Sequence, residues 1–179
     1  MTTTSSPNPF ADAHQTYLDA GWMPIPLPEG SKWPPPSKVT GDRGMPPTPA
    51  DIRRWLTRGY SSQEGHHSAP HNIGVRVGGD VIGLDVDHYG DKSGADELAR
   101  LEAEHGTLPA TWTSTARGDD NGPGVSAIHF YRVPNGTRIH ANPAPSIEAI
   151  QRHHRYAVVA PSINPKTGTF YRWYEPSGE

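Results

Sequence analysis

Apolar residues follow a helical spacing in three stretches of the chain. In the first, they recur every three or four positions after Asn8, which can cap a helix, and Gly21 follows the last of them. A similar spacing follows Thr48 and Ser93, two further residues that favour the start of a helix. The sequence therefore predicts three helices that begin near these capping residues, and it predicts a polar loop over 59–70.

Short apolar or alternating runs dominate the second half of the chain and predict strands. An earlier run, 22–27, contains two prolines, so it can form only an edge strand or an extended segment. The runs 73–77 and 81–87 flank a Gly-Gly-Asp turn and predict a β-hairpin. Further strands are expected in 111–115, 125–133, 146–150, 156–160 and 169–174. Helices come first and strands mostly follow, so the predicted fold class is α+β.

The composition of this 179-residue chain limits which metal ligands it can offer and where in the cell we expect it. It contains no cysteine, which excludes disulfides and thiolate metal sites, so any metal must bind to carboxylate, imidazole or backbone oxygen. Its formal charge of −3 argues against a protein that coats duplex DNA by charge alone. There is no apolar run that could span a membrane and no signal-peptide pattern, so we expect a cytoplasmic protein.

Two aspartates at the end of an apolar strand, Asp85 and Asp87, are the main candidates for chemistry. Residues two apart in a strand face the same way, with Cα atoms about 7 Å apart. Two such carboxylates repel each other in apolar surroundings, and a divalent cation such as Mg²⁺ or Mn²⁺ relieves that repulsion. The alternative is that the strand simply reaches the surface here with two solvated acids.

Two later strands carry polar residues that could join this pair. His129 alternates with apolar neighbours and could bind a phosphate oxygen or transfer a proton. Glu148 is a single acid within an apolar strand, so either a cation or a basic partner such as Arg155 should lie near it. The local pattern does not choose between a metal and a salt bridge.

The chain resembles the N-terminal catalytic domain of the bifunctional DNA primase-polymerases, or prim-pol family, of the archaeo-eukaryotic primase superfamily. The segment 21–27 with the later Lys32 is similar to the family's N-terminal element, and 84–87 is similar to its first metal motif. The segment 126–129 resembles the second motif, although this usually reads Ser-x-His and here two residues separate Ser126 from His129. Ile147-Glu148 resembles the third motif, and 156–173 resembles the closing segment.

The resemblance implies a single catalytic domain over 1–179, with an RRM-like catalytic sheet in 71–179 joined to a smaller N-terminal α/β unit in 1–70. It implies template-directed nucleotidyl transfer with two divalent ions, Mg²⁺ or Mn²⁺, held by Asp85, Asp87 and Glu148. The expected catalytic residues are these three acids and His129. The residues expected to bind the nucleotide are His129, Arg117, Ser126, Lys32 and Arg155. The residues expected to contact nucleic acid are Lys38, Arg152 and His154.

The implied partners are a DNA template and primer, dNTPs or NTPs, and a helicase domain or protein. The implied setting is phage, plasmid or mobile-element replication in a bacterial cell or a phage-infected host, and the chain could be one module of a longer replication protein. Two other functions fit the same residues. One is a metal-dependent nuclease or phosphohydrolase, in which the acids activate water. The other is a non-catalytic module that stacks single-stranded nucleic acid on Trp33, Tyr131 and Trp173.

Overall fold

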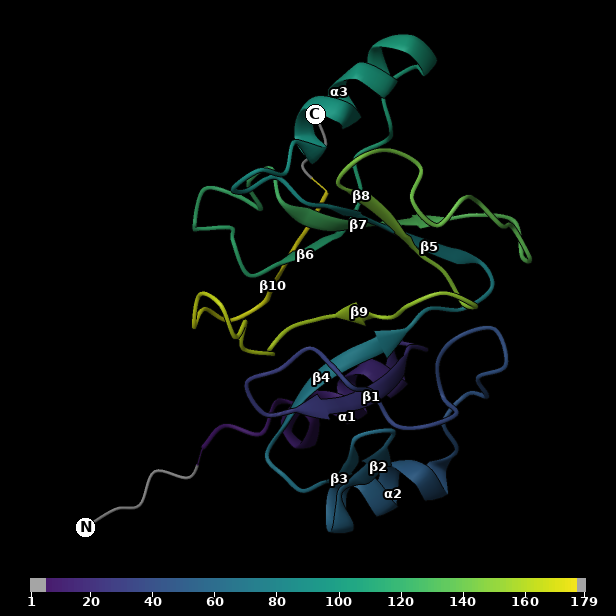
Figure 1. Ribbon diagram of the computed structural model, residues 1–179, viewed down its shortest axis with the longest axis vertical. Coiled ribbons are helices and arrows are strands. Elements are labelled where there is room, and N and C mark those ends of the chain that lie inside the picture. Colours follow the sequence, from purple (N-terminus) through teal and green to yellow (C-terminus); the bar gives the residue numbers. More distant parts are fainter. Residues whose placement is uncertain (1–5, 177–179) are drawn as a thin grey trace.

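The strands of the protein form three antiparallel sheets in the computed structural model, which describes residues 6–176. A five-stranded sheet in the order β10-β6-β7-β5-β8 lies beside a three-stranded sheet in the order β1-β4-β9 (Figure 1). Strands β2 and β3 form a separate hairpin. The strands are β1 (Met23–Pro28), β2 (Tyr60–Ser62), β3 (Gly65–His67), β4 (His71–Arg76), β5 (Val81–Val86), β6 (Thr113–Thr115), β7 (Ala127–Arg132), β8 (Ile147–Ile150), β9 (Ala157–Val158) and β10 (Arg172–Tyr174). This mixed architecture agrees with the predicted α+β class.

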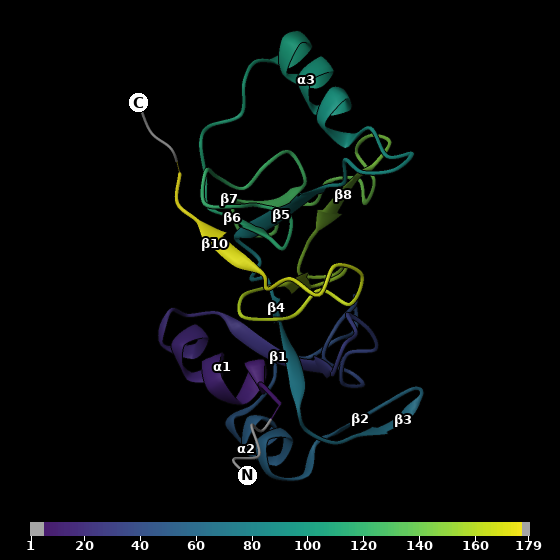
Figure 2. The ribbon, with the colours of Figure 1, turned by 90° about the vertical axis from the view of Figure 1, so that its left-hand side faces the viewer.

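The three predicted helices are present and begin at the predicted capping residues. They are α1 (Pro9–Asp19), α2 (Pro49–Arg58) and α3 (Gly94–His105). The Asn8 side chain accepts a hydrogen bond from the first turn of α1, and Thr48 forms a capping box with Asp51, whereas Ser93 makes no side-chain cap. Helices α1 and α2 lie with the three-stranded sheet, and α3 lies at the opposite end of the molecule (Figure 2). None of the helices described is long and apolar enough to cross a membrane.

The predicted hairpin between 73–77 and 81–87 is wrong. Strand β4 pairs with β1 and β9, whereas β5 pairs with β7 and β8, so the two runs belong to different sheets. Each strand has partners on both sides, and the turn at 78–80 carries the chain from one sheet to the other. The expected loop over 59–70 also contains the β2-β3 hairpin. The three-stranded sheet thus draws strands from both sides of residue 70.

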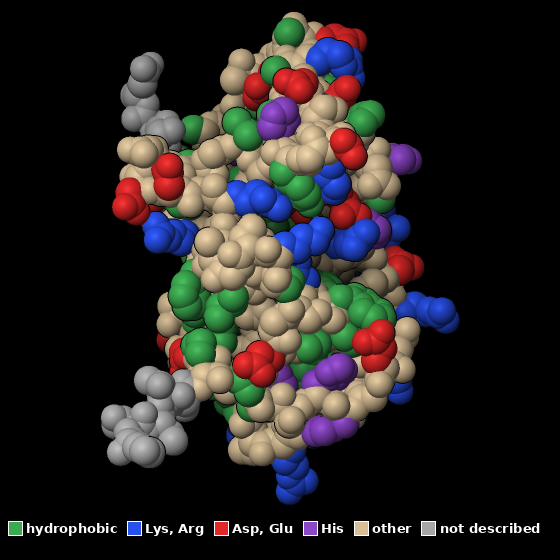
Figure 3. Space-filling model, turned by 60° about the vertical axis from the view of Figure 1, so that its left-hand side comes forward, with side chains coloured by type: hydrophobic (Ala, Val, Ile, Leu, Met, Phe, Trp, Pro, Cys, Tyr) green, Lys and Arg blue, Asp and Glu red, His purple; other side chains and the backbone are tan. Residues whose placement is uncertain are grey.

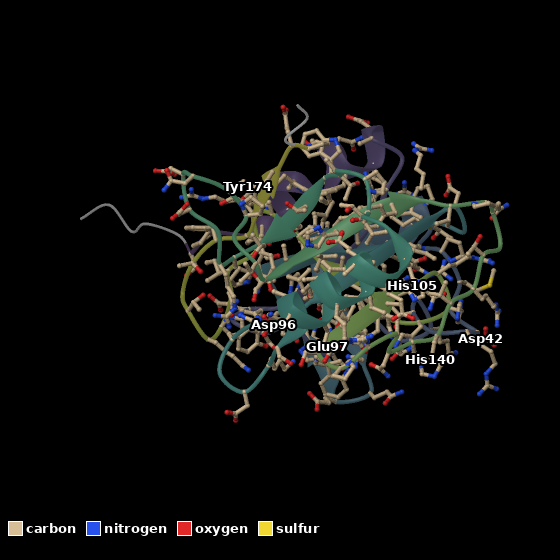
Figure 4. All side chains as sticks on the ribbon, turned by 90° about the horizontal axis from the view of Figure 1, so that it is seen from above. Asp42, Asp96, Glu97, His105, His140 and Tyr174 are labelled. Atoms are coloured by element: carbon tan, nitrogen blue, oxygen red, sulfur yellow. The ribbon has the colours of Figure 1, made fainter. Side chains whose placement is uncertain are left out.

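Side chains from other elements cover both faces of the sheet at strand β5. On one face Val86 packs with Ile147 against Leu98 and Leu101 of α3, and α3 crosses the sheet from Asp96 and Glu97 to His105 (Figure 4). The other face of the sheet contributes Ile128, Phe130 and Ile150 to the main core, which also contains the buried residues of β1 and β4. The acids near the end of β5 therefore project from a strand that packing holds firmly.

A buried histidine predicts how stability changes with pH. His71 is 1% exposed, and neither ring nitrogen has a hydrogen-bond partner among the described residues. Burial lowers its pKa from 6.5 to about 4, and nearby His67 and His66 act in the same direction. Because the unfolded chain binds this proton more tightly, the free energy of unfolding should be highest above about pH 6.5. It should fall by up to about 3 kcal/mol as pH decreases toward 4. Urea unfolding of the wild type and of His71→Phe at pH 7 and pH 5 measures this effect. The free energy of unfolding should fall more between these pH values in the wild type than in His71→Phe. An equal fall in both proteins would contradict the prediction.

Candidate active site

The register of the five-stranded sheet decides which predicted residues can meet. Asp85 lies opposite Ile128 of β7 on one side and opposite Glu148 of β8 on the other. Directly paired residues in antiparallel strands present their side chains on the same face. Asp85 and Glu148 are therefore neighbours on adjacent strands although they lie far apart in the sequence, and only the fold brings them together.

These acids open into a pocket of about 410 Å³. Asp87, which follows β5, lines the same pocket, so all three predicted acids line one pocket. Four of the other predicted residues also line it: Lys32, Arg117, Ser126 and Arg155. Figure 3 shows Lys and Arg side chains gathered around a hollow across the middle of this face. The volume falls within the range of small-molecule sites.

Crowding of the acids changes the ionisation of Asp85. Burial, together with the negative charges of Asp87 and Glu148, raises its pKa from 3.8 to about 7, while Lys32 and Lys92 oppose the shift. Such a carboxyl group ionises readily only when a positive charge is close by. Carboxylate oxygens are also the ligands that Mg²⁺ and Mn²⁺ prefer, so the chemistry of this donor set fits a divalent cation.

Basic side chains hold the other two acids. Lys92 forms an ion pair with Asp87, and the Arg155 Nε donates to Glu148 Oε1 at 2.7 Å. The His154 Nε2 lies 3.3 Å from the same oxygen. The sequence left open whether Glu148 meets a cation or a basic side chain. In the structure it forms a salt bridge with Arg155, within the pocket that the other two acids line. With these ion pairs formed, no group of three or more Asp, Glu or His side chains between residues 6 and 176 is placed so that it could hold a metal ion.

Backbone contacts fix the segment that follows β5. The Ser126 hydroxyl accepts from the His88 N–H at 2.8 Å and donates to the His88 carbonyl at 3.0 Å. Gly94, at the start of α3, donates its N–H to the Asp87 carbonyl. A Cβ at Gly94 would lie 2.6 Å from that oxygen, so only glycine permits this approach. Ser126 thus positions the acidic segment, and its hydroxyl is already engaged by backbone.

A cluster of cations surrounds the ring of Tyr89 at the edge of the pocket. The Arg117 guanidinium lies 3.8 Å from the ring centroid, and the Lys92 and Lys166 ammonium groups lie at 5.4 and 6.0 Å. Arg117 and Lys166 have no carboxylate partner within 4.0 Å in the described part of the chain. Lys32 similarly lies 5.4 Å from the ring of Tyr171. Cations held on aromatic rings without an acid are available to a phosphorylated ligand.

Sequence reasoning missed Tyr89, Lys92 and Lys166. The first two follow Asp87 closely in the chain, and a basic residue soon after paired acids could have been noted as a partner for one of them. Lys166 offered no such signal, because it lies in the turn region 163–168 and reaches the pocket only through the fold.

His129 does not join the acids, contrary to the prediction. It lies opposite Leu84 and Thr113, on the face that α3 covers, and it does not line the pocket. Burial lowers its pKa, and Glu102 of α3 opposes that shift. The residue two positions after Ser126, where the family usually has histidine, is Ile128, and Ile128 does line the pocket. The extra residue between Ser126 and His129 turns the imidazole to the other face because strand side chains alternate.

The three residues predicted to contact nucleic acid lie outside the pocket lining. Lys38 is exposed in the loop between β1 and α2. Arg152 lines a separate small cavity at the start of β5. His154 is placed beside Glu148, as described above, so it contacts an acid of the site.

A larger groove, of about 770 Å³, lies between α1 and the five-stranded sheet. Its lining is mainly apolar and includes Trp22, Trp112 and Trp173, and it contains neither the paired acids nor the cation cluster. The smaller pocket is therefore the candidate active site, because it alone of the two combines clustered acids with available cations.

An α+β fold with acids and available cations around one pocket fits the class of proteins that act on phosphorylated substrates. Within that class the chain belongs to the bifunctional DNA primase/polymerase family, because the model of the family's N-terminal domain matches residues 14–179. The resemblance seen in the sequence is confirmed. Membership implies DNA and nucleotide substrates and supports a nucleotidyltransferase of the DNA primase/polymerase type. Comparisons with curated proteins and with solved structures find no match.

Proposed function

We propose that the protein extends a DNA primer on a template by a two-metal mechanism, with Asp85, Asp87 and Glu148 holding two divalent ions. The observation that carries this proposal is the register of β5, which sets Asp85 opposite Glu148 in a pocket that Asp87 also lines. The raised pKa of Asp85 supports it, since crowded carboxylates of this kind gain most from a bound cation. When bound, Mg²⁺ or Mn²⁺ would activate a 3′-hydroxyl and neutralise the leaving pyrophosphate.

The other residues of the pocket have separate roles in the proposed reaction. Lys92 and Arg155 neutralise Asp87 and Glu148 in the structure described, and they must release these carboxylates before the acids can serve as ligands. Arg117 and Lys166, which have no acidic partner among the described residues, bind the triphosphate from the side of Tyr89. Ser126 holds the segment after Asp87 in place through the His88 backbone. Ile128 contributes an apolar wall where the family usually has histidine.

We further propose that the fold is of the archaeo-eukaryotic primase type. In this view the five-stranded sheet is the RRM-like catalytic sheet, and the three-stranded sheet with α1 and α2 forms the smaller N-terminal unit. The setting would be replication of a phage, plasmid or mobile element, in which a helicase domain or protein could act with this chain. The family match to residues 14–179 supports a role in DNA replication.

A primer-extension assay with labelled primer, dNTPs and Mg²⁺ or Mn²⁺ tests the proposed reaction. We expect primers lengthened in a template-dependent manner and no extension after removal of the ions with EDTA. Shortened DNA without nucleotide incorporation would instead identify a nuclease. DNA binding that neither nucleotide nor metal affects, with no product of either kind, would identify a non-catalytic binding module.

A further inference from the structure

A second group of cations lies around a small cavity at the other end of β5. The cavity has a volume of about 140 Å³, and its lining includes Arg76, Arg138, Arg152 and His153, with Asp42 as the one acid. Asp42 is engaged by Arg138 at 3.3 Å; Figure 4 labels Asp42 near the edge of the molecule. Three arginines against one carboxylate leave an excess of positive charge in a space too small for a nucleoside.

Arg76 makes this cavity unusual because its side chain is almost completely buried. The residue is 2% exposed, and its Nη2 donates to the Gly44 carbonyl at 2.8 Å. Its Nε and Nη1 have no hydrogen-bond partner among the residues described. A buried guanidinium with two unused donors is costly unless an anion or another acceptor satisfies them.

A second arginine increases that cost. Burial lowers the pKa of Arg76, and the positive charge of Arg152 lowers it further. The backbone at Gly79 forms part of the wall, and a side chain there would collide with Asn135 and touch Arg152. Two like charges held together over a glycine-lined hollow are the arrangement expected around a phosphate oxygen.

The position of the cavity relates it to the candidate active site. Val81 lines the cavity, and Asp85 lies four residues further along the same strand, which is about 13 Å. The turn 151–155 also connects them, because Arg152 lines the cavity whereas His154 and Arg155 contact Glu148. At a rise of about 3.4 Å per nucleotide, this separation corresponds to about four nucleotides of a duplex.

We propose that the cavity lined by Arg76, Arg138 and Arg152 binds a backbone phosphate of the DNA strand that reaches the candidate active site. This inference rests on the proposed function for the identity of its ligand, but not for the chemistry of the site, which fits a phosphate group from any source. A phosphate contact of this kind fixes the position of a strand without reading its sequence.

The test measures binding of primer-template DNA to the full chain without any reaction. Arg152→Gln, an exposed residue whose loss should not impair folding, is expected to raise the Kd for DNA about 3- to 10-fold at low salt. It should also reduce the slope of log K against log salt by about 1. Arg100→Gln on α3, also an exposed arginine, is the matched control and should change neither quantity. The affinity for dNTP should be the same in all three proteins. Equal DNA affinity and equal slopes for Arg152→Gln and the wild type would overturn the proposal.

A second measurement separates a DNA phosphate from free phosphate. Arg76→Met keeps an unbranched apolar side chain but removes the guanidinium and its charge, and it should lower DNA affinity in the same way as Arg152→Gln. If inorganic phosphate alone raises the melting temperature of the wild type but not of Arg76→Met, while DNA binding is equal, the cavity takes a free anion and the DNA assignment is wrong. Because neither assay requires catalysis, a failure here differs from an absence of primer extension.

Discussion

Replacement of Asp85 by Asn is expected to reduce primer extension by at least about 10³-fold, because a neutral amide cannot balance the charge of the ions that the reaction needs. Loss of one such ligand costs several kcal/mol of transition-state stabilisation, and each 1.4 kcal/mol is a factor of ten in rate. The substitution preserves the shape of the side chain and removes its repulsion from Asp87 and Glu148. The folded protein should therefore be at least as stable as the wild type.

The control for this prediction is Asp19→Asn, an exposed aspartate in the last turn of α1. It should leave extension unchanged. Thermal unfolding of both variants shows whether any loss of activity reflects unfolding. Extension by Asp85→Asn at more than a tenth of the wild-type rate would remove Asp85 from the proposed machinery.

The second large effect concerns the nucleotide. The double substitution Arg117→Gln and Lys166→Gln should raise the KM for dNTP by about 10²- to 10⁴-fold, since each hydrogen bond to a charged group contributes about 1.5–3 kcal/mol. Neither residue has an acidic partner in the described structure, so their loss leaves no carboxylate without its ion-pair partner. Steady-state kinetics with varied dNTP measures this, with Lys38→Gln, an exposed lysine outside the pocket, as the control.

Direct binding distinguishes this role from a structural one. The affinity of the double variant should fall strongly for dNTP and little for the corresponding monophosphate, because the two cations are assigned to the outer phosphates. An equal loss for both nucleotides, or a fall in kcat at unchanged KM, would show that Arg117 and Lys166 do not bind the triphosphate.

The sequence was sufficient for the local features of the fold. Helices α1 and α2 could be predicted because Asn8 and Thr48 are caps that act on the adjacent turn, and β1 could be identified as an edge strand from its prolines. The hairpin between β4 and β5 could not be excluded in this way. A Gly-Gly-Asp turn between two apolar runs is compatible with pairing of the runs and with a crossing between sheets, and only the contacts with β1, β7, β8 and β9 decide between them.

In the candidate site, too, some features could be predicted from the sequence and others depend on contacts between distant segments. Asp85, Asp87 and Glu148 could be predicted as a group because their motifs resemble those of the family, and the pairing of β5 with β8 then brings them together. His129 does not reach the pocket because side chains alternate along a strand. One additional residue after Ser126 therefore moves the imidazole to the face that α3 covers. Lys166 could not be predicted, since its approach to Tyr89 depends on how the closing segment folds over the pocket.

The central claim is that Asp85, Asp87 and Glu148 bind the ions that promote nucleotidyl transfer, and a crystal structure with Mn²⁺ and a non-hydrolysable dNTP tests it most directly. Anomalous scattering should place Mn²⁺ between these three carboxylates, with Lys92 and Arg155 withdrawn from Asp87 and Glu148 and the triphosphate beside Arg117 and Lys166. If Mn²⁺ lies elsewhere, or if Glu148 remains paired with Arg155 while nucleotide is bound, the proposed metal site is wrong.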